Sequence, residues 1–195
     1  FFSFKDTDGL TFESAYGMLC MKLAFAFQDY QFLLDDDAIS DDDKGIFKRI
    51  LGRTASMDET KSCFLLLTRM LEIHFKKSAV VILDEYDVPI AKASSNGYYS
   101  QMLDVMRAMM STTLKDNTSL DFAVVTGCLK IAKESIFTGT NNFVSDTILS
   151  PRLSESFGFT QADVDQMLKD AGLESQSAEI KAWYDGYHFG DADIY

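Results

Sequence analysis

The sequence predicts an α/β fold built on a mainly parallel sheet, and two features support this prediction. Residues 79–83 read A-V-V-I-L, an apolar run of the kind that is typical of a strand buried on both faces. Segments with a helical spacing of apolar residues separate this run from two further apolar segments, at 1–5 and 120–126. Because strands that alternate with helices are joined by crossover connections, we expect these strands to run parallel.

The predicted helices of the first half begin at capping residues. Thr11 follows a turn and is a favoured cap. Ser40 and Ser56 are each followed three residues later by an acidic residue. In this capping pattern the two side chains each accept a hydrogen bond from a backbone amide at the start of a helix. The predicted helices run from Thr11 to about Leu34, from Ser40 to near Gly52, and from Ser56 through Phe75.

In the second half, short polar segments separate the predicted elements, and near Pro151 the sheet pattern gives way to short helices. We therefore expect a first region at residues 1–150 and a small, mostly helical lobe at 151–195. The elements predicted after the central strand are a loop at 94–97, a helix at 98–114, a strand at 120–126, and helices at 160–171 and 177–183.

The composition excludes several classes of function. The net charge of −12 argues against a nucleic-acid-binding surface, which needs clustered Lys and Arg. Six aspartates at 35–37 and 41–43 lack the pattern of a calcium loop and predict a solvated loop and helix start. The three cysteines are far apart, which is typical of free thiols in a reducing compartment. Without a long apolar segment or a leader pattern, we expect a cytoplasmic protein with no membrane contact.

The central strand ends at three carboxylates, Asp84, Glu85 and Asp87. Open α/β sheets bind ligands at the carboxyl ends of their strands. An apolar strand followed by D-E suits magnesium-dependent phosphate chemistry, in which one acid holds the metal's water shell and the next polarises a water. These residues are equally compatible with a solvated acidic turn. A phosphatase of the haloacid-dehalogenase type needs D-x-D, and here the second Asp comes one residue late.

Four motifs in order resemble the AAA-ATPase-like proteins of bacteria. They are D-E-Y-D-V-P-I at 84–90, T-G-C-L-K-I-A-K-E-S-I-F-T-G-T-N-N-F at 126–143, F-G-F-T at 157–160 and W-Y-D-G-Y-H-F-G at 183–190. The resemblance implies a three-layer P-loop NTPase-like sheet of the ASCE/AAA type, with ATP and Mg²⁺ as ligands. It also implies ATP hydrolysis and, often, a fused nuclease-like effector domain resembling PD-(D/E)xK nucleases.

The resemblance also implies roles for individual residues. Asp84 would orient Mg²⁺ and Glu85 would activate the hydrolytic water, as in a Walker B strand. Thr126 would read the γ-phosphate as a sensor. Lys130 would stabilise phosphate charge, unless it is a solvated lysine at a helix start. The family signature at 184–187 predicts a packed turn with Gly186 at positive φ.

The sequence departs from the family pattern because it has no G-x-x-x-x-G-K-[ST] loop. We therefore expect a fragment, with residues 1–150 forming an ATPase-like core that lacks the Walker A strand and loop. Residues 151–195 would begin a lid-like helical subdomain. The missing strand would pack beside 120–126, and its absence would leave an open apolar edge and weak nucleotide binding. The alternative is a slow nucleotide-dependent switch that regulates a fused effector.

Overall fold

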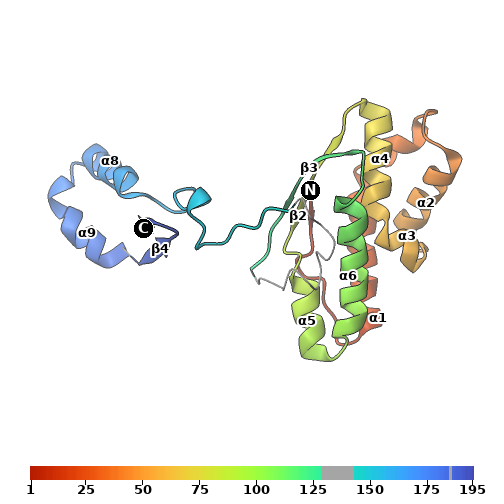
Figure 1. Ribbon diagram of the computed structural model, residues 1–195, viewed down its shortest axis with the longest axis horizontal. Helices are drawn as coiled ribbons and strands as arrows, with labels where there is room; N and C mark the ends of the chain where they lie inside the picture. Colours follow the sequence, from red (N-terminus) through yellow and green to blue (C-terminus); the bar gives the residue numbers. More distant parts are fainter. Residues whose placement is uncertain (129–142, 185) are drawn as a thin grey trace. The chain divides into compact units, whose positions relative to one another are not determined.

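The computed structural model describes residues 1–128, 143–184 and 186–195 (Figure 1). The chain divides into two compact units, Phe1–Asn141 and Asn142–Tyr195. Each unit has its own secondary structure, and we describe each by itself.

A parallel sheet forms the centre of the first unit. Its strands are β1 (Phe2–Ser3), β2 (Ala79–Asp84) and β3 (Leu120–Val125), in the order β1-β2-β3. Both pairings are parallel, and Leu83 of β2 is aligned with Phe2 on one side and Val125 on the other. The predicted α/β class with a parallel sheet is therefore confirmed.

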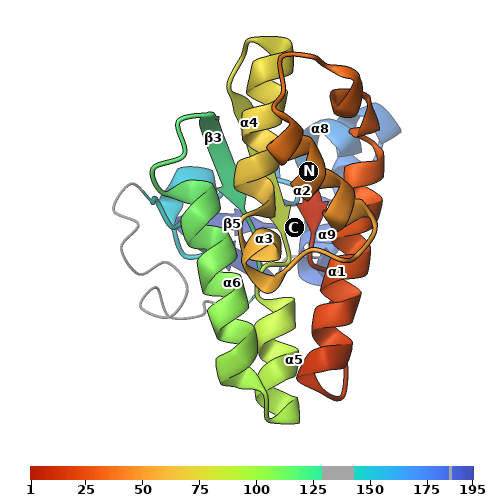
Figure 2. The same ribbon diagram turned by 90° about the vertical axis from the view of Figure 1, so that its right-hand side faces the viewer.

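Helices pack beside this sheet (Figure 2). Thr11, Ser40 and Ser56 each accept a hydrogen bond from a backbone amide three residues later, which confirms the predicted caps. The helices are α1 (Phe12–Gln28), α2 (Asp41–Leu51), α3 (Met57–Lys61), α4 (Cys63–Phe75), α5 (Val88–Asn96) and α6 (Tyr99–Leu114), and a 3-10 turn, η1 (Gln31–Asp35), follows α1.

Two predicted helices were too long. The helix expected to reach Leu34 ends at Gln28, and the tighter turn of η1 that follows places Leu33 in the core. The helix expected from Ser56 to Phe75 divides at Ser62, whose hydroxyl donates to the carbonyl oxygen of Asp58 at 2.9 Å. This local bond competes with helix continuation.

The loop predicted at 94–97 was wrong over most of its length, because α5 continues to Asn96. Pro89 stands in the first turn of α5, where its fixed φ favours a helix. The polar residues Ser94, Ser95 and Asn96 lie on a helix that buries Ile90 and Ala93. The helix ends at Gly97 with φ of 84°, a left-handed conformation that glycine adopts readily.

The prediction that β2 is buried on both faces was wrong. Leu83 is 1% exposed, and its neighbour in the sheet, Phe2, packs against Phe64 of α4 with ring centroids 5.1 Å apart. Ile82, on the opposite face, is 38% exposed. The outward residues Val80 and Phe122, aligned in the sheet, are also more than half exposed. Within the described residues the sheet and its helices form two layers, so the third layer remains a prediction.

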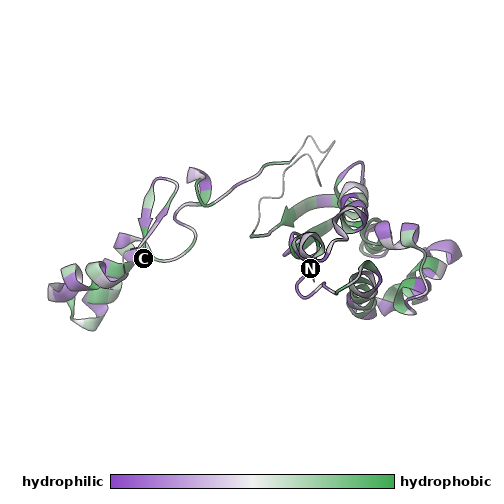
Figure 3. Ribbon diagram, turned by 90° about the horizontal axis from the view of Figure 1, so that it is seen from below, coloured by the Kyte–Doolittle hydropathy of each residue, from purple (hydrophilic) through white to green (hydrophobic). Residues whose placement is uncertain are grey.

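The second unit contains helices and a β-hairpin (Figure 3). Thr160 and Asp163 form a capping box at the start of the first helix, as the sequence predicts for position 160. The elements are η2 (Pro151–Leu153), α8 (Gln161–Ala171), η3 (Glu174–Gln176), α9 (Ser177–Tyr184), and the antiparallel strands β4 (Tyr187–Phe189) and β5 (Ala192–Ile194).

The family signature at 184–187 joins α9 to this hairpin. Asp185 lies outside the described residues, and no heavy atom lies within 4 Å of the position that a Cβ would take at Gly186. The packed turn predicted at Gly186 is therefore wrong. The close packing occurs at Gly190, where φ is 56° and a Cβ would lie 2.9 Å from the Cα of Pro151.

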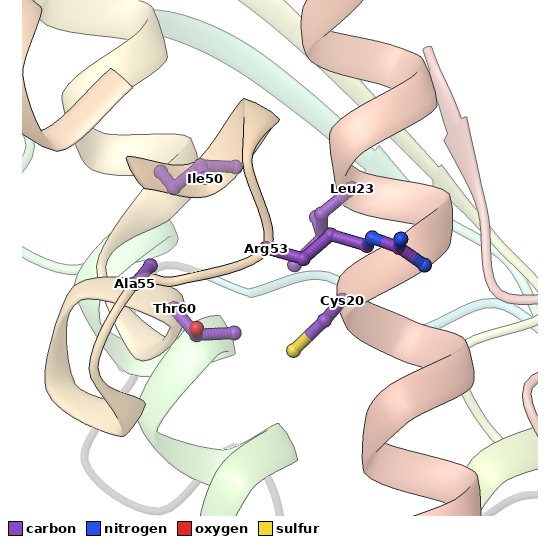
Figure 4. Close-up of a pocket in the computed structure, with 6 residues that line it drawn as sticks. All are labelled: Cys20, Leu23, Ile50, Arg53, Ala55 and Thr60. Atoms are coloured by element: carbon purple, nitrogen blue, oxygen red, sulfur yellow. The ribbon is translucent and has the colours of Figure 1, made fainter. Parts of the chain in front are cut away.

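The cysteines form no disulfide, and they differ in burial. Cys63 is buried and Cys20 is partly buried, so burial raises the pKa of both thiols, whereas Cys128 is exposed. Burial also raises the pKa of Tyr16, next to Cys20, to about 12. Figure 4 shows Cys20 at a cavity of about 10 Å³ between α1 and the α2–α3 segment. This cavity has room for about one water molecule.

None of the helices in the described parts of the chain is long and apolar enough to cross a membrane.

Substitutions on the two faces of β2 test whether one face is exposed to solvent. We expect Leu83→Ala to lower the free energy of unfolding by about 2–5 kcal/mol, because it creates a cavity in the core. Ile82→Ala should cost about 1 kcal/mol, mainly through the lower β-propensity of alanine. Urea denaturation of both variants measures the difference. Equal losses would mean that both faces of the sheet are covered in solution.

The thiols should react in the order of their exposure. We expect Ellman's reagent to modify Cys128 fast, Cys20 slowly, and Cys63 only after unfolding in urea, because the thiolate is the reacting species and must be accessible. Cys128→Ser should remove the fast phase and leave the others unchanged. Equal rates for Cys63 and Cys128 in the folded protein would contradict the buried position of Cys63.

Candidate functional site

The candidate site lies at the carboxyl edge of the parallel sheet. Asp84 ends β2, and Thr126 directly follows β3. The amide of Thr126 donates to the carbonyl oxygen of Leu83 at 2.9 Å, so the β2–β3 pairing continues to the edge. The amide of Phe4 donates to the carbonyl oxygen of Asp84 at 2.9 Å from the other side. The backbone of Asp84 is therefore fixed by both neighbouring segments.

The side chains of Asp84 and Thr126 contact each other, although 42 positions separate them in the sequence. The Thr126 hydroxyl donates to Oδ1 of Asp84. The same oxygen accepts the backbone amide of Glu85 at 3.0 Å. Both bonds fall on Oδ1, so they orient the carboxylate and leave Oδ2 outside this pair of bonds. The structure thus brings together two of the residues that the sequence predicts for the site.

Glu85 has an unusual backbone conformation. Its φ is 53°, in the left-handed region that non-glycine residues rarely adopt. Its carbonyl oxygen accepts the amide of Val88 at 3.1 Å, which closes a turn into α5. The amide of Tyr86 donates to the carbonyl oxygen of Thr126 at 3.1 Å, which joins this turn to the end of β3. Such strained residues persist where the surrounding structure holds them, and they cluster at functional sites.

The third acid, Asp87, differs from the other two because it is only 3% exposed. It directly precedes α5, and its carbonyl oxygen accepts the amide of Ala91 at 2.9 Å. The sequence predicts three carboxylates at one strand end, but burial separates Asp87 from solvent. A phosphatase of the haloacid-dehalogenase type needs its second Asp at the metal site, so this burial argues against that alternative.

Two further expectations fall on other parts of the chain. Lys130 lies outside the described residues. Among the residues that are described, no three His, Cys, Asp or Glu side chains gather as a metal-binding group. A magnesium ion at this edge would therefore depend on one or two carboxylates together with water and phosphate oxygens, which is how Mg²⁺ is usually held at nucleotide sites.

The aspartate-rich segment at 35–43 has structural contacts. The backbone amide of Ala38 and the side chain of His74 both bond to Asp36, and these bonds lower the pKa of that carboxyl. Asp43 forms an ion pair with Arg69 of α4. His74, which looks isolated in the sequence, thus has a partner that is 38 positions away. These acids connect the start of α2 and the segment before it to α4.

Comparison with known proteins identifies the family. A protein family described as "Predicted AAA-ATPase" matches residues 2–137. An Azotobacter chroococcum mcd 1 protein, described as an uncharacterized protein in the vnfD 5' region, is 29% identical over 151 residues. This match spans 77% of the present chain but 29% of the length of that relative. No solved structure matches the chain.

The matched region contains β1 to β3 and the edge at which Asp84, Glu85 and Thr126 lie, and it extends over more than half of the chain. The chain belongs to the AAA-ATPase-like family, which is described as a family of predicted AAA-ATPases.

Proposed function

We propose that this chain supplies the Walker B half of a magnesium–ATP site in an ATPase. The observation that carries the proposal is the convergence of Asp84, Glu85 and Thr126 at the carboxyl edge of a parallel sheet. In open α/β sheets this edge is the usual position of a ligand. Membership of the family supports a nucleotide as that ligand.

The donor atoms fit a hydrated magnesium ion. Asp84 offers a hard carboxylate oxygen, Oδ2, that neither of the two bonds at Oδ1 uses. We assign Asp84 to hold Mg²⁺ through water, as one or two carboxylates do at phosphate sites. When bound, Mg²⁺ would neutralise charge that develops on the transferred group. The fixed orientation of Asp84 would lower the entropic cost of holding the metal's water shell.

Glu85 is the proposed general base. A carboxylate directly after the metal-binding acid can accept a hydrogen bond from the attacking water and take its proton. The left-handed φ of 53° sets the direction in which the Glu85 side chain leaves the backbone. The turn that begins α5 and the bond between Tyr86 and Thr126 hold this direction. Glu85 is partly buried rather than freely solvated, which limits the water around it.

Thr126 has one hydroxyl proton, and in this structure the hydroxyl donates its hydrogen bond to the carboxylate of Asp84. A phosphate oxygen, like a carboxylate oxygen, can only accept a hydrogen bond. Thr126 therefore cannot donate to Asp84 and to a γ-phosphate at the same time. We propose that Thr126 orients Asp84 in the absence of nucleotide and changes its acceptor when a γ-phosphate arrives, which is how the predicted sensor role would operate here. Lys130 stays a candidate for stabilising phosphate charge.

The remainder of the site would come from residues outside this sequence. The sequence has no P-loop pattern, and among the described strands β3 pairs only with β2. A strand carrying the P-loop would pair with the outer edge of β3, completing a P-loop NTPase-like sheet. The helix after that strand would cover the face that Val80 and Phe122 now expose. Residues 151–195 would belong to a lid-like subdomain, and a nuclease-like effector would be the fused domain.

Replacing Glu85 with Gln in the protein of natural length tests the base. We expect turnover of ATP to fall by about 100-fold or more, because the amide cannot take a proton. The dissociation constant for magnesium–ATP should change less than about threefold, since the side chain keeps its size. Steady-state hydrolysis and calorimetric titration measure the two quantities. Asp121→Asn, an exposed acid on β3, is the matched control.

Unchanged turnover in Glu85→Gln would contradict the assignment of the base. Tight binding of magnesium–ATP by the unaltered protein without measurable turnover would favour the alternative function, a nucleotide-dependent switch that regulates a fused effector.

The 195-residue chain alone should bind magnesium–ATP with a dissociation constant above about 1 mM, which corresponds to about −4 kcal/mol. The reason is that the sequence lacks the P-loop, whose amides and Lys hold the phosphates. Calorimetry with and without Mg²⁺ measures this. If the chain alone bound magnesium–ATP in the micromolar range and Asp84→Asn abolished this binding, the proposal that the P-loop half of the site lies outside this sequence would be contradicted.

A further inference from the structure

Gly127 lies where the segment that follows β3 contacts the turn that follows β2. A Cβ at this position would be 2.5 Å from Oδ1 of Asp87, and 2.8 and 2.9 Å from two ring carbons of Tyr86. Real Cβ atoms essentially never show contacts below 3.0 Å, so a side chain at position 127 would force a neighbour to move. Glycine after Thr126 therefore lets the side chains of Tyr86 and Asp87 pack this closely on the segment that follows β3.

The requirement at Gly127 is one of space, not of backbone conformation. Its φ is outside the left-handed region, in contrast to Gly97 and Gly158. An alanine at position 127 would therefore meet no strain from φ itself. The penalty that the structure shows for Gly127→Ala is the collision with Tyr86 and Asp87. The substitution is therefore a direct probe of the contact between Gly127 and the turn that follows β2.

The neighbours of Gly127 differ in their freedom to move. Asp87 is buried and directly precedes α5, which packs against α6. Tyr86 is partly exposed, but its amide is bonded to the carbonyl oxygen of Thr126. The atoms that a Cβ would meet belong to the side chains of both residues, and the burial of Asp87 leaves its carboxylate little room to rotate away. We expect the buried side chain of Asp87 to relieve the collision in part by shifting the backbone of the turn that contains Glu85.

We propose that Gly127 is a positioning residue for the catalytic turn: its missing side chain lets Tyr86 and Asp87 pack on the end of β3, and this packing fixes Glu85. This inference rests on the proposed function of Glu85 as the general base. Gly127 does not touch the reacting atoms, and it acts through the two residues that follow Glu85. Displacement of a catalytic group by about 1 Å lowers turnover by about 100-fold.

The test compares Gly127→Ala with Gly17→Ala in the protein of natural length. Gly17 lies on α1, and a Cβ there meets no heavy atom within 4 Å, so the same chemical change has no collision. We expect Gly127→Ala to lower the turnover number of ATP hydrolysis by about 10- to 100-fold. The dissociation constant for magnesium–ATP should stay within about threefold of the unaltered protein. Gly17→Ala should change neither.

Hydrogen exchange supplies a readout that does not need ATP. The amides of Tyr86 and Val88 report the two bonds that hold the Glu85 turn. In Gly127→Ala they should exchange at least about 10-fold faster, while the amides of α1 keep their protection. Faster exchange throughout the protein would indicate general destabilisation and would overturn the positioning role. If the unaltered protein hydrolyses no ATP, the proposed function fails, and exchange alone decides whether Gly127 fixes the turn.

A double variant tests whether the collision is the cause. Asp87→Ala removes the atom at 2.5 Å, so combining it with Gly127→Ala should cost less turnover than the product of the two single losses. Should Gly127→Ala fail to fold, Tyr86→Ala removes the ring that packs on Gly127 and so loosens the same contact. The exchange rate of the Val88 amide and the turnover number of Tyr86→Ala are then compared with those of the unaltered protein. Unchanged turnover and exchange in these variants would overturn the proposal.

Discussion

The parallel pairing of β2 with β3 is the constraint on which the candidate site depends. Leu83 is aligned with Val125, so the residues that come next, Asp84 and Thr126, lie at the same edge and on the same face. The hydroxyl of Thr126 then reaches the carboxylate of Asp84. A slip of one residue in this register would turn Thr126 to the opposite face and separate the pair. The helices fix this register by burying Leu83 and leaving Ile82 outside.

The position of the site could be predicted from the sequence because both strands end abruptly in polar residues, at Asp84 and Thr126. Parallel topology then places the two ends together. The length of α5 could not be predicted, because S-S-N at 94–96 has the composition of a loop and becomes helical through the burial of Ile90 and Ala93. Tertiary packing overrides local propensity in such segments. The burial of Asp87 follows from the same helix.

The open face of the sheet shows what a run of apolar residues can and cannot predict. A-V-V-I-L has no alternation, so its pattern predicts a strand with apolar surroundings on both sides. In the structure Leu83 has these surroundings and Val80 does not. An apolar strand predicts that apolar groups cover both of its faces. It does not identify the part of a protein that provides this cover. Only the arrangement of helices around β2 reveals that one face lacks a cover among the described residues.

The backbone of Glu85 connects the stability of the fold with the geometry of the site. A non-glycine residue at φ of 53° costs about 1 kcal/mol or more, and the hydrogen bonds around it offset this strain. One of these bonds joins the Tyr86 amide to Thr126, and another joins the Val88 amide to Glu85 itself. Replacement of Glu85 by Gly would remove the carboxylate and relieve the strain together, so its effect would have two causes. Glu85→Gln keeps the backbone strain and changes only the proton acceptor. Gly127→Ala keeps the proton acceptor and changes only the packing that holds the Glu85 turn. Chemistry and positioning at this edge can therefore be separated only by comparing substitutions that leave one of them intact.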